Sequence, residues 1–183
     1  MKKIVIILVI AVAVVILIFA IIYFVIPVLI LGGFIPPAPS YNKLDRYLKE
    51  NIDELLYIID TFSEFEYDYV QVRKYPHREE QKNKMNVGFL GSDGEYIPIS
   101  DELNDRIEKL YKSGVCDISC GRDSVDFCMW SSIGEHRGIA YSKNGDLPEV
   151  WAVIEIKPLS IENWYYYVSN FEKAKARNPE LFK

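Results

Sequence analysis

The chain has 183 residues, and its 26 acidic side chains outnumber its 21 basic ones, which gives a formal net charge of −5 at pH 7. Nucleic-acid-binding proteins present concentrated positive charge, so this balance excludes a nucleic-acid partner. The part of the chain that follows residue 39 is long enough for one compact domain and too short for two.

The N-terminal part of the sequence predicts a membrane segment. Residues 4–31 contain no charged or strongly polar side chain, and a helix needs only about 20 such residues to cross the bilayer core. The run is about twice as long as the roughly 7 to 15 apolar residues of a cleaved signal peptide, which predicts an uncleaved, single-pass signal anchor. Residues 1–3 include Lys2 and Lys3, so the positive-inside rule predicts a short cytoplasmic tail. The domain is then extracytoplasmic, in a bacterial envelope, with the lipid bilayer as the first partner.

A stalk and a long amphipathic helix are expected next. Residues 32–39 hold a Gly-Gly pair and three prolines, which predict a short stiff linker ahead of a domain of residues 40–183. Ser40 is the expected N-cap of a helix that ends near Phe65. Its apolar side chains recur on one face: Leu44, Leu48, Ile52, Leu55, Ile59 and Phe62. We expect the domain's own sheet to cover this face; the alternative is an accessory subunit that dimerises through residues 41–65.

Beyond this helix the hydrophobic period changes to two, which is typical of strands. The pattern recurs in eight segments: 67–75, 86–90, 95–99, 116–120, 124–130, 138–142, 149–157 and 164–170. Ser100 and Gly114 predict the start and end of a second helix. Short polar connections favour an antiparallel meander. The expected fold class is therefore α+β: a transmembrane helix, a stalk, an amphipathic helix, and an antiparallel β-meander of about five to seven strands with one further helix.

All three cysteines lie between residues 116 and 128. A hairpin with Arg122 and Asp123 at its tip places Cys120 opposite Val125, Ile118 opposite Phe127 and Cys116 opposite Met129 on an apolar face, while Asp117 faces Cys128 on the other. Cys116 and Cys120 are then ~13 Å apart along one strand, too far for a disulfide or a shared zinc ion. The pattern predicts buried thiols, no metal site and no cofactor.

A cysteine nucleophile is the alternative chemical interpretation of this region. Cys128 lies on the more polar face of the predicted hairpin, Asp126 is beside it, and His136 in the following loop is the candidate base. A thiol and an imidazole within hydrogen-bonding reach would make the chain a membrane-anchored hydrolase or transferase. No helix N-terminus or cationic cluster that would lower the pKa of Cys128 is evident.

Aromatic residues gather in the C-terminal strands. They occupy both sides of one strand and extend to its predicted neighbours: Trp130, Tyr141, Trp151, Trp164, Tyr165, Tyr166 and Tyr167. One side is expected in the core, and the other is either covered or exposed as a surface that binds a protein or a glycan. The sequence thus favours a membrane-anchored, non-enzymatic binding domain with a sensing, envelope-contact or protective role, and it identifies no ligand.

Overall fold

The computed structural model describes residues 19, 37–74, 84–88, 94–132 and 134–182. The predicted membrane segment, residues 4–31, lies outside this part of the chain except for Phe19, as does most of the predicted stalk. Within the described ranges, no helix has the length and the apolar character needed to span a bilayer. A compact unit extends from Ala38 to Lys183, and its described residues form the fold below.

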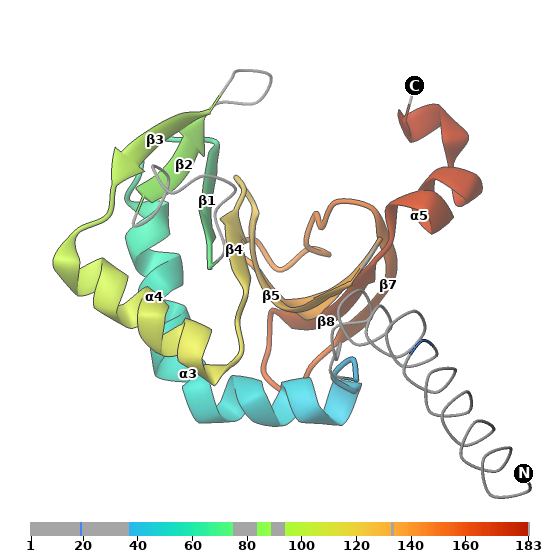
Figure 1. The fold of residues 1–183 in the computed structure, drawn as a ribbon, viewed down its shortest axis with the longest axis horizontal. Coiled ribbons are helices and arrows are strands. Elements are labelled where there is room, and N and C mark those ends of the chain that lie inside the picture. Colours follow the sequence, from blue (N-terminus) through green and yellow to red (C-terminus); the bar gives the residue numbers. More distant parts are fainter. Residues whose placement is uncertain (1–18, 20–36, 75–83, 89–93, 133, 183) are drawn as a thin grey trace, which may run out of the picture. The chain divides into compact units, whose positions relative to one another are not determined.

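One antiparallel sheet of eight strands is the centre of this unit (Figure 1). Its strands follow the order β3-β2-β1-β4-β5-β6-β8-β7. In chain order they are β1 (Tyr69–Arg73), β2 (Lys84–Gly88), β3 (Glu95–Pro98), β4 (Asp117–Cys120), β5 (Ser124–Ser132), β6 (Glu135–Ser142), β7 (Val153–Pro158) and β8 (Trp164–Ser169). Each of the eight segments with a two-residue period contributes a strand, so the sheet is larger than the expected five to seven strands.

The predicted simple meander is wrong at two places. β4 pairs with β1 rather than with β3, and β8 pairs with β6, which leaves β7 at the edge. Burial explains the second exchange, because β8 is almost wholly buried whereas β7 is largely exposed. The more apolar strand therefore takes the inner position. A connection of ten residues between β6 and β7 leaves room for this order.

Two helices cover one face of the sheet: α3 (Tyr41–Ser63) and α4 (Asp101–Ser113) (Figure 1). The apolar face predicted for α3 is confirmed. Five of its side chains are buried in the core and Ile52 packs against it: Leu44, Leu48, Leu55, Ile59 and Phe62. The domain's own core thus covers the face that a dimer through residues 41–65 would otherwise use.

The ends of the helices follow the predicted positions with one difference in chemistry. The Ser100 side chain accepts a hydrogen bond from the Leu103 amide at 3.4 Å, and Gly114 ends α4 in the left-handed region with φ 119°. Ser40 precedes α3, but its backbone oxygen rather than its hydroxyl accepts the first helical amides. A third helix, α5 (Phe171–Arg177), and a 3-10 turn, η3 (Pro179–Phe182), complete the chain.

Candidate functional site

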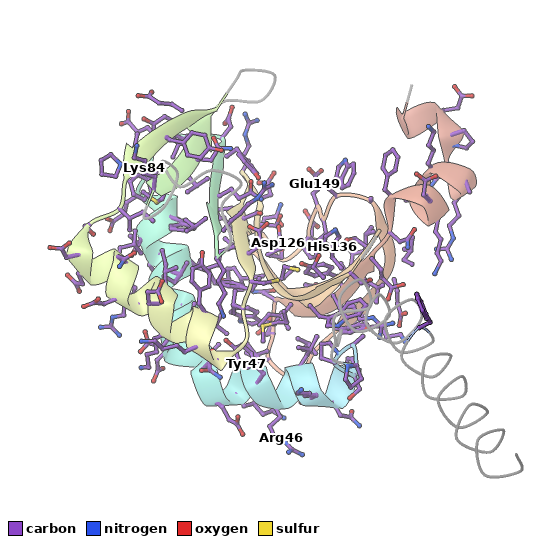
Figure 2. The ribbon with its side chains drawn as sticks, in the orientation of Figure 1. Arg46, Tyr47, Lys84, Asp126, His136 and Glu149 are labelled. Atoms are coloured by element: carbon purple, nitrogen blue, oxygen red, sulfur yellow. The ribbon has the colours of Figure 1, made fainter. Side chains whose placement is uncertain are left out.

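The hairpin of β4 and β5 forms in the register that residue alternation predicts. Asp117 pairs with Cys128, Ile118 with Phe127, Ser119 with Asp126 and Cys120 with Val125. Ile118, Val125 and Phe127 point into the helix-covered core. Asp126 and Cys128 therefore lie on the opposite side, which we call the polar face. Figure 2 shows Asp126 and Glu149 on this side, away from Tyr47 of α3.

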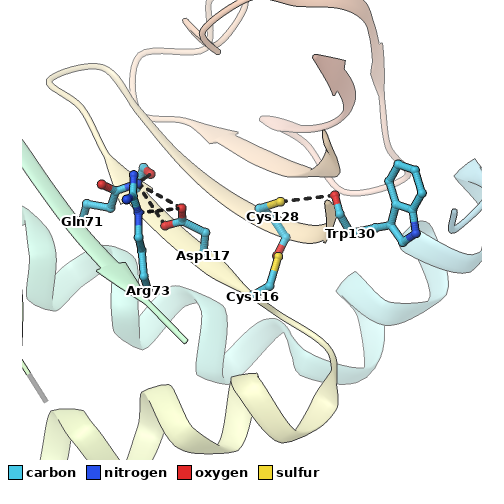
Figure 3. A network of polar contacts seen from close by, with 7 residues as sticks. Gln71, Arg73, Cys116, Asp117, Cys128 and Trp130 are labelled. Carbon is cyan, nitrogen blue, oxygen red and sulfur yellow. Dashed lines mark hydrogen bonds and ion pairs between the residues drawn. The ribbon is translucent and has the colours of Figure 1, made fainter. Parts of the chain in front are cut away.

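Hydrogen bonds link the polar side chains of β1 and β4 across this face. Gln71 Nε2 donates to the two carboxylate oxygens of Asp117 at 3.0 and 3.2 Å, and to Ser119 Oγ at 3.4 Å. Arg73 Nε lies 3.5 Å from the same carboxylate (Figure 3). Tyr69 hydrogen-bonds Ser119. Asp117 is thus held by an amide and a guanidinium on the neighbouring strand.

A second carboxyl group, Asp126 of β5, has the side chain of Tyr167 on β8 as its hydrogen-bond partner. Strand β6 lies between them, and Tyr167 pairs there with Gly138. A Cβ atom at Gly138 would lie 2.9 Å from both Cε1 and the hydroxyl of Tyr167, and 2.1 Å from the backbone oxygen of Phe127. The phenol can reach across β6 because this position has no side chain.

Burial shifts the titration of both carboxyl groups upward. It raises the pKa of Asp117 to about 6, against the opposing effects of Arg73 and Gln71. It raises the pKa of Asp126 to about 7, and the nearby charge of Asp117 adds to that increase. Two carboxyl groups on adjacent strands, Asp117 and Asp126, thus titrate near neutral pH. Such groups suit proton transfer or the recognition of a hydrogen-bond donor.

The structure places the candidate nucleophile Cys128 in a setting that disfavours the thiolate. Its thiol donates to the Trp130 carbonyl oxygen at 3.4 Å. The contact with Cys116, together with burial, raises the pKa of the Cys128 thiol well above its ordinary value. Reactive cysteines require the opposite shift.

His136, the candidate base, lies on β6 rather than in the predicted loop, and it pairs with Ser131 and Ser169. Burial lowers the pKa of its imidazole. Among the described residues, no hydrogen bond or ion pair joins it to Cys128 or Asp126. The structure therefore unites Asp126 and Cys128 on one face without forming the thiol–imidazole pair that catalysis requires.

The predicted position of Cys116 is wrong. Its amide donates to the Cys128 carbonyl oxygen at 2.8 Å, its thiol donates to the same oxygen at 3.1 Å, and the two thiols interact. Cys116 precedes β4, and a register shift between Cys128 and Trp130 ends the regular alternation there. Cys120 remains on the core side, where it accepts a hydrogen bond from Lys143 Nζ at 3.3 Å. The three thiols are free.

The seven candidate aromatic residues do not form one exposed surface. Trp164 and Tyr166 are core residues, with Phe127 and Tyr141 against the Trp164 ring at 6.0 and 5.2 Å between centroids. Tyr167 is buried on the polar face, whereas three others are partly buried: Trp130, Tyr141 and Tyr165. Trp151 alone of the seven is largely exposed, at 69%.

Trp151 belongs to a small apolar surface at the edge of the sheet. Its ring is stacked on Phe171, with centroids 5.3 Å apart and planes at 14°. Val153 follows at the start of β7 and is exposed, and Leu147 is exposed in the preceding loop. We call Trp151, Val153 and Phe171 the Trp151 patch. The sequence indicated Trp151, but its pairing with Phe171 depends on the end of β8 lying beside β7.

No group of three or more histidine, cysteine or acidic side chains in the described ranges is arranged to hold a metal ion. Comparison of the chain with protein-family models, with curated proteins and with solved structures finds no match.

Proposed function

We propose that this chain is a membrane-anchored, non-enzymatic binding protein. Residues 4–31 hold it in the bilayer, and its extracytoplasmic domain contacts a protein or glycan through the Trp151 patch. The observation that carries the proposal is the exposure of Trp151, at 69%, on a ring held flat against Phe171.

The energetics of recognition support this assignment. Tryptophan contributes more binding free energy than most residues at protein interfaces, and planar aromatic rings also stack on sugars. Stacking on Phe171 fixes the Trp151 ring before binding, which reduces the entropy lost when a partner docks. The patch lies at the edge strand β7, so a partner can approach it without displacing another strand.

Photo-crosslinking from defined positions tests the binding role. A benzoylphenylalanine residue replaces Trp151 in the full chain, and a matched control replaces Tyr96, which is 42% exposed on the opposite edge strand β3. We expect a discrete adduct from position 151 in intact cells and none from position 96. Equal adducts from both positions, or none from either, would contradict a binding role for the Trp151 patch.

A separate experiment tests the anchor and its orientation. The full chain should remain in the membrane pellet after an alkaline wash, because 28 consecutive apolar residues (4–31) give stable insertion. In intact spheroplasts, added protease should degrade the domain. Release by the alkaline wash would refute the anchor, and protection from protease would reverse the proposed topology.

A further inference from the structure

We propose that Cys116 and Cys128 form a reversible disulfide by exchange with a disulfide-containing oxidant, while Cys120 remains a free thiol. This redox site goes beyond the proposed binding function, and its test does not depend on the Trp151 patch.

The backbone brings the two cysteines to adjacent positions. The Cys116 amide donates to the Cys128 carbonyl oxygen at 2.8 Å. The direct Cα partner of Cys128 is Asp117, so Cys116 is offset from it by one residue. An offset of ~3.3 Å along strands about 4.8 Å apart places the two Cα atoms roughly 6 Å from each other, within the roughly 4.4 to 6.8 Å that a disulfide spans. The Cys116 thiol lies 3.1 Å from the same oxygen and interacts with the Cys128 thiol, and Figure 3 shows both side chains.

The local backbone allows the small adjustment that bond formation requires. Cys116 lies between Gly114, which ends α4 with φ 119°, and the first residue of β4. On the partner strand the regular register is interrupted immediately after Cys128. A rotation of the Cys116 side chain breaks its hydrogen bond to the Cys128 carbonyl oxygen and brings its sulfur to the Cys128 sulfur, with which it forms the disulfide. The paired residues Asp117 and Ile118 keep their ladder positions.

The two thiols differ in accessibility and in acidity. Cys116 is partly exposed, whereas Cys128 is buried. The neighbouring side chain of Cys128, as a hydrogen-bond partner of the sulfur, lowers the pKa of the Cys116 thiol, and the positive charge of Lys74 acts in the same direction. Cys116 is therefore the thiol that meets an oxidant first, and Cys128 is the resolving thiol.

The exchange reaction balances in two steps. The Cys116 thiolate attacks one sulfur of a disulfide R–S–S–R, which forms a Cys116–S–S–R mixed disulfide and releases one thiolate, RS⁻. The Cys128 thiolate then attacks the Cys116 sulfur, which forms the Cys116–Cys128 disulfide and breaks the mixed disulfide with release of the second thiolate, RS⁻. The protons from the two cysteines go to the leaving thiolates. Two cysteine thiols are thus oxidised to one disulfide, and R–S–S–R is reduced to two R–SH molecules.

Cys120 is excluded from this pair by its position. It points into the core on the other side of the sheet and accepts a hydrogen bond from Lys143. It is separated from Cys116 by four positions along the chain, ~13 Å in an extended strand. Burial raises the pKa of the Cys120 thiol, which further slows exchange.

Thiol mapping of the full chain in detergent tests the proposal. The reduced protein is equilibrated without air in mixtures of oxidised and reduced glutathione, then alkylated and digested for mass spectrometry. We expect two thiols to be lost, one peptide pair to be linked through Cys116 and Cys128, and Cys120 to be alkylated. The matched control Cys120→Ala should give the same linked pair.

Two variants separate the attacking thiol from the resolving thiol. Cys128→Ser should stop at a glutathione adduct on Cys116, whereas Cys116→Ser should leave Cys128 as a thiol. A glutathione adduct that persists on Cys116 in the unaltered chain would overturn the proposal. So would a bridge that includes Cys120, or three thiols that all resist oxidation until the protein is unfolded.

Thermal unfolding of the unaltered chain gives a measurement that needs no substitution. The bridge would close a loop between residues 116 and 128 and restrict the unfolded chain. The oxidised protein should therefore unfold at a temperature higher by roughly 5 to 10 °C than the reduced protein. An equal or lower unfolding temperature after the bridge has formed would show that the native geometry does not fit it.

Discussion

The two faces of the β4–β5 hairpin are built from alternating residues of the same strands, yet they follow different physical rules. Ile118, Val125 and Phe127 lie under α3 and α4, where burial of apolar surface dominates their contribution to stability. Asp117 and Asp126 lie on the polar face, where hydrogen bonds and protonation dominate. Substitutions on the first face should change stability at every pH, whereas those on the second should change how stability depends on pH.

The largest effect is expected on the helix-covered face. Phe127 is fully buried and stacks on Trp164 with centroids 6.0 Å apart. Phe127→Ala should lower the free energy of unfolding by about 3 to 5 kcal/mol, because it removes buried surface and leaves a cavity. Denaturant titration of the full chain measures this change. Ser131→Ala, an exposed position on the same strand, should change it by less than about 0.5 kcal/mol. Similar values for the two variants would contradict the assignment of the core.

A steric test on the polar face should give the next largest effect. A methyl group at Gly138 would meet the Phe127 backbone oxygen at 2.1 Å, which side-chain rotation cannot relieve. Gly138→Ala should therefore cost about 2 kcal/mol or more in unfolding free energy, by overpacking. The control Gly121→Ala places its methyl group 3.8 Å from the nearest backbone atom and should be mild. Equal costs would contradict the close approach of the Phe127 backbone oxygen and of Tyr167 to Gly138.

The partly buried carboxyl group of Asp126 should set part of the pH dependence. Its pKa is raised to about 7 in the folded chain, so the folded state binds its proton more tightly than the unfolded state. Stability should fall as the pH rises from about 4 to about 7 and then level off. Asp126→Asn removes the charge and keeps an oxygen acceptor for Tyr167. It should flatten this slope and raise stability at pH 8, by on the order of 2 kcal/mol.

Urea titrations across that pH range measure the slope. Asp123→Asn is the matched control, because it removes the same charge at the exposed tip of the hairpin. The interpretation of Asp126 would be refuted by an unchanged slope in Asp126→Asn, or by the same change in both variants.

The smallest effect is expected where the two covering helices meet. Glu54 of α3 is 8% exposed and lies 3.0 Å from Arg106 of α4, with Lys109 also in contact. These contacts lower the pKa of Glu54, so its contribution is present at neutral pH and is lost as the pH falls below about 4. Glu54→Gln should cost about 1 kcal/mol at pH 7 and less at pH 3. Glu50→Gln, on the exposed side of α3, is the control. An equal loss of stability in both variants would show that the contacts of Glu54 with Arg106 and Lys109 contribute nothing specific.

Part of the arrangement on the two faces of the β4–β5 hairpin could be predicted from the sequence. Alternation of apolar and polar residues was sufficient to place Asp126 and Cys128 on the face opposite the core. It could not predict that Asp117 and Asp126 titrate near neutral pH, because their burial depends on strands β1 and β8, which are distant in the chain. It also misplaced Cys116, since regular alternation stops where the register shifts beside Cys128.

By itself, the sequence determined the class of the two covering helices and of the eight strands, and the side of α3 and of the β4–β5 hairpin that meets the core. The spacing of Leu44, Leu48 and Leu55 defines one face of α3, and Ser100 and Gly114 mark the limits of α4, because these features depend on local backbone geometry. Only the tertiary structure decided the strand order, the contact between Cys116 and Cys128, and the reach of Tyr167 over Gly138 to Asp126. Those contacts join segments whose pairing is selected by the burial of whole strands, and no short-range pattern encodes that selection.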